Sequence, residues 1–164
     1  MENWNEILEA YALGPEILSR ILVDIPDESI DLALNKENWS IRGIIHHIVE
    51  GDDLFISFIK QALGGLGGEF HMAWYFEQSQ VEWGKCWGFE TREIETALDL
   101  FKANRAHTCS ILADIEKPWE YKLTISWPDH EPIEYNIPDI MDFQIRHLEE
   151  HLDEIREIIK FHQP

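Results

Sequence analysis

Residues 138–159 read PDIMDFQIRHLEEHLDEIREII, and this stretch decides the fold. Its apolar residues recur at spacings of about three and four, which places them on one face of a helix. They are Met141, Ile145, Leu148, Leu152, Ile155 and Ile159. Pro138 suits the first turn of such a helix, because the backbone N–H that proline lacks has no partner there. A long helix with one apolar seam is typical of a helical bundle.

The same stretch carries His147 and His151, four residues apart. On a helix this spacing puts both imidazoles on one face, one turn apart and next to the apolar seam. Such a pair can hold a divalent metal ion, as it does in several zinc enzymes. Two ligands make a poor site, so a metal centre requires a third from elsewhere in the chain.

A second helix is predicted from Ser40, a suitable N-cap, to about Leu63, and it contains His46 and His47. Residues spaced three and four positions apart on the face of His47 are Ile44, Gly51, Leu54 and Phe58, which are apolar or small. The corresponding face of His46 carries Glu50 and Asp53. We therefore expect His47 to point inward and His46 outward. Gly51, one turn beyond His47, leaves open space inside the bundle. Together, His47, His147 and His151 predict a three-histidine site with positions left for water or substrate.

The remaining histidines and the acidic neighbours have simpler interpretations. A histidine taken alone is more often a surface or hydrogen-bonded core residue than a ligand, and this is our interpretation of His71, His107, His130 and His162. His107 shares a helix face with Leu100, Asn104 and Ile111, so it could be partly buried. His71 could act as an acid or base if its segment covers the site. The carboxylates around His151 are most simply a solvated face, although one of them could orient an imidazole.

Two more helices complete the predicted bundle. The first spans about 4–23, and Gly14-Pro15 should kink or split it, because proline removes a donor and clashes with the preceding turn. The other, which we expect Thr91 to cap, runs from about Ile94 to Ile115 with apolar residues at helical spacing.

The segments between these helices are irregular. The run GGLGG at 64–68 should end the second helix. Residues 70–90 are rich in aromatic residues without clear periodicity, which suggests a long loop or short helix that covers something. Its aromatic rings could line an apolar pocket, although core packing is the simpler account. These rings are Trp74, Tyr75, Phe76, Trp83 and Trp87. Alternation around Pro128-Asp129 predicts a short β-hairpin or extended excursion before the last helix.

The composition of the chain excludes some classes of function. The chain has 164 residues, 45% of them apolar, and a formal net charge of -19. We expect a single domain over 1–164. Spread-out acidic charge disfavours binding to nucleic acid or to anionic membranes. No stretch predicts a membrane span or a secretory signal, and Cys86 and Cys109 form no CxxC pair, so we expect a cytoplasmic protein.

Three stretches resemble the DinB-like superfamily of four-helix bundles. The first is NWSIRGIIHHIVEGD at 38–52, in which a Trp precedes the inward His by eight residues. The second is RHLEEHLDEI at 146–155. Between them, PWEYKL at 118–123 and PIEYNIPDIMDF at 132–143 are similar to the family's Trp-containing turn and extended segment before the last helix. Glu154 is a departure, since many relatives show Gln there.

The resemblance implies that His47, His147 and His151 bind a divalent metal ion, with Ni, Zn, Mn and Fe all open. It also implies a small-molecule substrate and permits a homodimer. Hydrolysis by metal-activated water is the function we favour, because an anionic thiol would need a basic pocket. The alternatives are a thiol (S-)transferase and a non-enzymatic bundle that binds metal or a small ligand. The catalytic acid or base stays unassigned.

Overall fold

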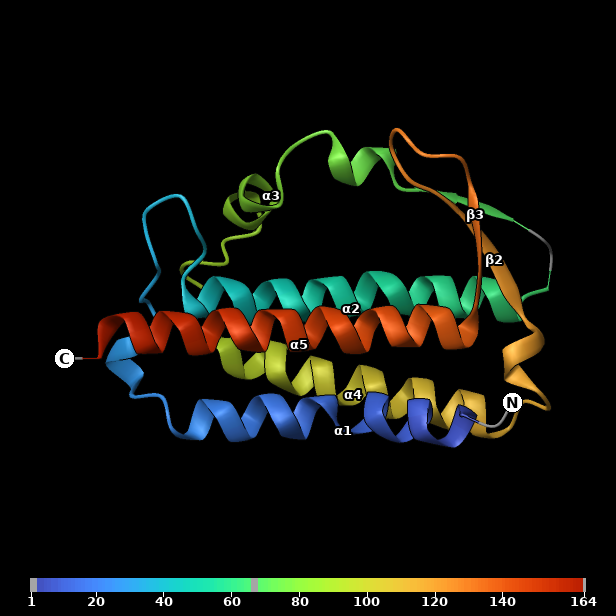
Figure 1. Ribbon diagram of the computed structural model, residues 1–164, viewed down its shortest axis with the longest axis horizontal. Coiled ribbons are helices and arrows are strands. Elements are labelled where there is room, and N and C mark those ends of the chain that lie inside the picture. Colours follow the sequence, from blue (N-terminus) through green and yellow to red (C-terminus); the bar gives the residue numbers. More distant parts are fainter. Residues whose placement is uncertain (1–2, 66–67, 164) are drawn as a thin grey trace.

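The computed structural model describes residues 3–65 and 68–163, and four long helices run side by side through it (Figure 1). They are α1 (Trp4–Val23), α2 (Ile41–Leu63), α4 (Ile94–Ala113) and α5 (Ile137–His162). Both α1 and α2 pack against α4 and α5, so each helix has two neighbours. The predicted four-helix bundle is confirmed. Among the described helices, none combines the length and the apolar character needed to cross a membrane.

A small sheet lies at one end of the bundle. Its strands are β1 (Glu69–His71), β2 (Lys122–Ser126) and β3 (Ile133–Asn136), in the order β1-β2-β3. β2 and β3 form the predicted hairpin, with Thr124 opposite Glu134. β1 joins β2 in parallel, with Phe70 opposite Ile125. This strand was not predicted, because three residues are too few to show an alternating pattern.

The aromatic segment forms a cover over the bundle. It contains the short helices η2 (Ala73–Phe76) and α3 (Gln80–Cys86), which arch above α2 in Figure 1. α3 packs against α2. The remaining short elements are η1 (Asp27–Ser29) and η3 (Pro118–Glu120). The segment between β1 and α4 therefore covers one face of the bundle, as the sequence predicted.

Capping side chains set the starts of two of the long helices. The Ser40 hydroxyl accepts the backbone N–H of Gly43 at the start of α2, which confirms the predicted cap. At the start of α5, Asn136 and Asp139 accept each other's backbone N–H and form a capping box. Pro138 lies in this first turn, as predicted.

Two predicted helix ends differ from the structure. Thr91 does not cap α4: the helix begins at Ile94, and the Thr91 hydroxyl donates to the Gly88 carbonyl in the preceding turn. α4 ends at Ala113, two residues before the predicted end. α2 ends at Leu63, as predicted, but residues 66 and 67 of the glycine-rich break lie outside the described residues.

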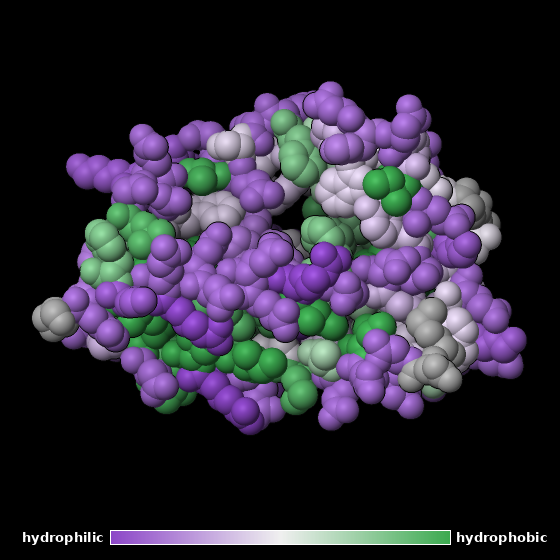
Figure 2. All heavy atoms as spheres, in the orientation of Figure 1, coloured by the Kyte–Doolittle hydropathy of each residue, from purple (hydrophilic) through white to green (hydrophobic). Residues whose placement is uncertain are grey.

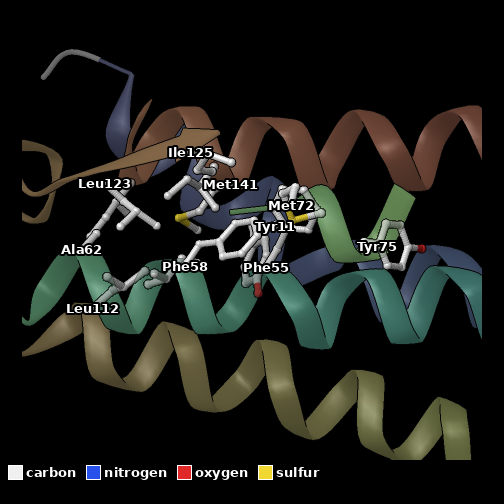
Figure 3. Close-up of a cluster of buried hydrophobic side chains, with 13 residues drawn as sticks. Tyr11, Phe55, Phe58, Ala62, Met72, Tyr75, Leu112, Leu123, Ile125 and Met141 are labelled. Carbon is white, nitrogen blue, oxygen red and sulfur yellow. The ribbon is translucent and has the colours of Figure 1, made fainter. Parts of the chain in front are cut away.

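Apolar side chains form two separate clusters. One lies beneath the sheet, and Figure 3 shows its members reaching inward from α1, α2 and β2; they include Tyr11, Phe55, Phe58, Leu123 and Ile125. The other lies toward the far end of the bundle and includes Leu18, Ile45, Phe101, Leu152 and Ile155. Along each of the long helices, the members of the two clusters follow one another rather than alternate.

A buried arginine occupies the level between the clusters. Arg105 on α4 is only 2% exposed. Its Nε donates to Asp52 Oδ1 of α2 at 3.0 Å, Nη1 to the Tyr11 carbonyl of α1 at 2.9 Å, and Nη2 to the Gln144 carbonyl of α5 at 3.2 Å. The guanidinium therefore bonds to all three of the other long helices. Gln144 Nε2 also donates to Asp52 Oδ1 at 2.9 Å, which ties α5 to α2 directly.

Gly14-Pro15 makes room for this arginine and does not split α1. A Cβ atom at position 14 would lie 2.1 Å from Arg105 Nη1, so no larger residue fits. Pro15 has no N–H to donate to the Tyr11 carbonyl one turn earlier. Arg105 supplies the missing donor. The helix therefore runs unbroken from Trp4 to Val23, and the dipeptide that suggested a break forms part of a tertiary contact.

Burial and the buried guanidinium act on Asp52 in opposite directions. Burial raises the pKa of this carboxyl to about 6, whereas the charge and hydrogen bond of Arg105 and the hydrogen bond of Gln144 limit the rise. Arg105 is thus the group that favours the carboxylate form of Asp52 inside the bundle. A buried pair of this kind contributes little net stability over an apolar pair, but removing one partner strands the other charge.

We expect Arg105→Met to lower the free energy of unfolding at pH 7 by about 3–5 kcal/mol, because it leaves Asp52 buried without its counter-ion. The matched control is Arg20→Met, which removes an exposed partner of Glu16 and should cost less than about 1 kcal/mol. Urea unfolding followed by circular dichroism measures both. Equal costs for the two variants would contradict the role given to Arg105.

Candidate metal centre

Three histidines meet between α2 and α5. His47 comes from the first half of α2, and His147 and His151 lie one turn apart on α5. The Nε2 atom of His147 lies 3.1 Å from Nε2 of His47 and 3.1 Å from Nε2 of His151. One ligand atom from each of the three rings falls within 4.8 Å of the others. The three residues chosen from the sequence are thus brought together in space.

His46, by contrast, does not point outward as predicted. It is 1% exposed, its ring stacks on Phe89 with centroids 5.5 Å apart, and its Nε2 lies 3.2 Å from the Arg92 carbonyl, to which it can donate. The outward direction was predicted from the bundle helices only, whereas the segment after α3 covers the opposite side of α2. His46 therefore anchors the cover and is not one of the three converging rings.

Burial keeps two of the three imidazoles neutral. It lowers the pKa of His47 to about 2, with the neighbouring His147 and His151 adding to the effect. It also lowers the pKa of His147 to about 3, again with His151 and then Arg105 contributing. Neutral imidazole is the form that binds a metal ion. No proton has to leave these two rings near pH 7 before a cation can enter.

The spacing of the ring nitrogens suits one small cation. Metal–nitrogen distances of about 2.0–2.1 Å, with ligand angles of about 90–110°, separate two coordinating nitrogens by about 2.8–3.4 Å. The two Nε2 pairs centred on His147 lie at 3.1 Å. The ring planes of His147 and His151 are perpendicular, and those of His47 and His151 meet at 88°. The donor set therefore fits a divalent ion bound by three nitrogens.

Glu154 orients the most accessible of the three rings. Its Oε2 lies 2.9 Å from Nδ1 of His151, and this hydrogen bond holds the pKa of Glu154 below its usual value. A carboxylate can only accept, so Nδ1 carries the proton and Nε2 presents its lone pair to the cluster. Carboxylates in this position raise the basicity of a ligating imidazole and fix its orientation.

Aromatic rings and one glycine position the other two histidines. Trp39 lies against His47 with ring centroids 4.2 Å apart, and Phe143 stacks on His147 with centroids 6.3 Å apart and an interplanar angle of 14°. Gly51 leaves the room predicted for it, and the His147 ring fills that room: a Cβ atom there would lie 3.0 Å from His147 Cε1. These contacts explain how two long helices keep three rings at bonding distance.

The site opens to solvent beside His151. A cavity of about 460 Å³ is lined there by His151 and Glu154 of α5, by Trp39 and by residues at the start of α3. On the face shown in Figure 2, a hollow lies between α5 and the segment that carries α3 and η2. A small molecule can therefore reach the histidines from the side between the bundle and its cover.

The other candidate residues lie away from this cluster. His71, His107, His130 and His162 are exposed. His71 lies on β1 with Nδ1 3.8 Å from Glu69, and the partial burial considered for His107 is not observed. Cys86 and Cys109 are both free thiols. In the aromatic cover, Tyr75 is buried, Trp83 and Trp87 pack against the first apolar cluster, and Trp74 and Phe76 are exposed.

Two features were not predicted. The sequence does not distinguish Glu154 from its three neighbouring carboxylates, because the choice depends on the rotamer of His151. The burial of Arg105 and Asp52 was not predicted either, although each lies on an otherwise apolar helix face: Arg105 falls between Phe101 and Leu112 on α4. A charged residue inside such a seam is a signal that could have been used.

Three comparisons relate the chain to known proteins. The family model described as the DinB superfamily matches residues 10–155. A protein of Oceanobacillus iheyensis named "Putative metal-dependent hydrolase OB0782" is 25% identical over 125 residues, which cover 76% of this chain and 69% of that protein. The solved structure of YfiT from Bacillus subtilis, described as a probable metal-dependent hydrolase with an unusual four-helix bundle topology, superposes with a TM-score of 0.80 at 15% identity. The match covers 98% of this chain and 87% of that one.

The lowered histidine pKa values predict how the stability of the metal-free protein depends on pH. Below the ordinary value of 6.5, the unfolded chain binds protons on His47 and His147 that the folded chain does not, so stability falls as the pH falls. Each histidine should contribute about 1 kcal/mol per pH unit between about pH 6 and 5. Urea unfolding in EDTA should therefore give a steeper pH dependence for the parent than for the double variant His47→Gln/His147→Gln. Parallel curves would show that the two rings titrate normally.

Proposed function

The chain belongs to the DinB superfamily, and from that premise we propose that it is a metal-dependent hydrolase whose divalent ion is held by His47, His147 and His151. The observation that carries the proposal is the convergence of three imidazole nitrogens, two of them on rings kept neutral by burial, beside an open cavity. The names given to the two similar proteins support the same reaction class.

The three rings suit several first-row cations, and nickel, zinc, manganese and iron all accept imidazole ligands. When bound, such an ion supplies Lewis-acid chemistry: it lowers the pKa of water toward neutrality or polarises an acyl oxygen. Glu154 acts as a positioning residue, because its carboxylate holds the Nδ1 proton of His151 and so directs Nε2 inward. Trp39 and Phe143 pack against the rings of His47 and His147 and so limit their movement.

The open cavity supports an enzyme over a structural or storage site. His151 lines the cavity directly, so a small molecule can lie next to the histidine cluster. A purely structural metal is normally enclosed by four protein ligands. Among the described residues, only three His, Cys, Asp or Glu side chains converge here. Coordination positions would therefore stay free for water and substrate.

The charge around the cavity favours hydrolysis over thiol transfer. Its lining includes the carboxylates of Glu37, Glu154 and Glu157, and none of its described lining residues is a lysine or an arginine. An anionic low-molecular-weight thiol would be repelled by these groups, whereas water would not. A homodimer and a cytoplasmic location stay predictions from the sequence.

Metal binding is the first test. Protein purified without a histidine tag and loaded with nickel, zinc or manganese should retain about one metal ion per chain by elemental analysis, whereas His47→Ala and His151→Ala should retain almost none. The reason is that two imidazoles lose the three-point site on which retention depends. His107→Ala, which removes an exposed histidine of α4, is the matched control and should bind as the parent does. Equal metal content in His151→Ala and the parent would rule out the assigned ligands.

The orientation by Glu154 predicts a smaller effect on affinity. Glu154→Gln removes the charge that His151 bonds to, so metal affinity should fall by about 10- to 100-fold while the helical content stays unchanged. Glu150→Gln, an exposed position on the same helix, is the control. Competition with a chromophoric chelator measures both, and unchanged affinity in Glu154→Gln would remove its positioning role.

Hydrolysis itself is tested by turnover. Metal-loaded protein should cleave one or more members of a panel of chromogenic esters, lactones and amides, and activity should fall at least about 100-fold in His47→Ala. His107→Ala should retain it. Parallel reactions with added low-molecular-weight thiols separate the alternatives by mass spectrometry of the products. Thioether products without hydrolysis would replace the hydrolase proposal by thiol transfer.

A further inference from the structure

A second cavity, of about 590 Å³, lies farther along α5 from the histidines. Four aromatic side chains line it: Phe76 of η2, Trp127 after β2, Tyr135 of β3 and Phe143 of α5. We refer to these four residues as the aromatic slot. Its volume falls within the range of roughly 300–1,000 Å³ typical of small-molecule sites. The slot uses residues from the cover, the hairpin and the bundle, so it exists only in the complete fold.

The rings of the slot are held in place by one another. Phe76 and Trp127 meet edge to face with centroids 6.1 Å apart, and Trp127 and Phe143 lie 6.2 Å apart at 32°. Trp127 Nε1 donates to the Tyr135 hydroxyl at 3.2 Å, which uses the only polar atom of the indole and leaves the Tyr135 O–H free to donate. Phe143 is backed by Phe55, stacked with centroids 4.6 Å apart. What the slot offers a ligand is therefore mainly ring surface.

The charge of the slot selects the kind of ligand. Aromatic faces carry the negative part of the ring quadrupole and attract organic cations. Asp129 adds a carboxylate at the tip of the β2–β3 hairpin and His130 adds an imidazole beside it, and none of the described lining residues is a lysine or an arginine. The chain as a whole has a formal net charge of -19. An ammonium group with methyl substituents matches both properties, because it is cationic and apolar at once.

Phe143 connects the slot to the histidine cluster. It lies one helical turn before His147, and the two rings stack at 6.3 Å. A group bound against Phe143 therefore lies beside the ring that His47 and His151 both approach. A ligand group bound in the slot is therefore separated from the cluster by one side chain, that of Phe143.

We propose that the aromatic slot binds an organic ammonium group, and that the substrate of the hydrolase carries this group at a distance that brings its scissile bond to the histidines. The second part rests on the function proposed above; the first part does not. In the reaction, water adds to the acyl carbon, the bond to the leaving oxygen or nitrogen breaks, and the leaving group departs with a proton. The slot fixes the substrate and takes no part in bond breaking.

Binding is tested with choline and its neutral isostere 3,3-dimethylbutan-1-ol, which has nearly the same shape without the charge. Titration of metal-free protein, followed by NMR of the indole resonances, should show choline binding at least about tenfold more tightly. Phe76→Leu and Asp129→Asn should each reduce that preference severalfold. Phe76 is 47% exposed, and asparagine tolerates the left-handed backbone of Asp129 (φ 61°), so neither change threatens the fold.

The matched control is Trp74→Leu, which removes an exposed aromatic ring of η2 outside the slot and should leave choline binding unchanged. Equal affinity for choline and its isostere would overturn the proposal. So would choline binding that survives both Phe76→Leu and Asp129→Asn, since the cation would then bind elsewhere.

The substrate assignment is tested with acetylcholine and 3,3-dimethylbutyl acetate, a matched pair of esters, on metal-loaded protein. The ratio of their kcat/KM values should favour the cation by about tenfold and approach one in Asp129→Asn. Cleavage of both esters at equal kcat/KM would overturn the substrate assignment and leave the hydrolase intact. Choline binding in the slot without cleavage of either ester, or of any compound in the wider panel, would overturn the hydrolase and leave the cation site intact.

Discussion

The bundle depends on one buried charge. Arg105 has to satisfy its guanidinium where water cannot reach it, and it does so with one acceptor from each of the other long helices: Asp52, Tyr11 and Gln144. Such a contact tolerates little displacement, because any helix that moved would leave a buried donor or a buried carboxylate without a partner. Apolar contacts, by contrast, are non-directional. The arginine therefore fixes the relative height of four helices that the apolar seams only bring together.

The histidine cluster benefits from that constraint. Asp52 follows Gly51, over which the His147 ring lies, and Gln144 precedes His147 by one turn. The hydrogen bonds among Arg105, Asp52 and Gln144 thus hold α2 and α5 in register directly beside the imidazoles. His147 Nε2 can remain about 3 Å from Nε2 of both His47 and His151 before any cation is present only if the helices that carry the rings cannot shift, and this preorganisation is what a tight metal site needs.

The sequence predicted those features that depend on one helix or one periodic pattern. The seam of residues 138–159, the Ser40 cap and the hairpin before the last helix are of this kind, and all are confirmed. The convergence of the three histidines was also predictable, because inward faces of neighbouring helices must meet. The failures share a different cause. His46 is buried by a segment distant in sequence, and Gly14-Pro15, for which a kink or a split was predicted, does not split α1 but accommodates an arginine of another helix. Patterns within one element carry no information about partners outside it.

The same division separates the part of the chain that sets the fold from the part that forms the aromatic slot. Helix positions are fixed by a few buried groups, so bundles that share only 15% identity can superpose with a TM-score of 0.80. The cover and the hairpin combine buried residues, such as Tyr75 and Leu123, with rings that reach the surface, such as Phe76. Phe76 and Trp127 meet each other across two such segments and form a surface that no bundle helix supplies alone. The positions of the histidines follow from the buried contacts of the helices, whereas the aromatic slot follows from the charge and shape of the segments above them, and the substrate class proposed above rests on the second of these.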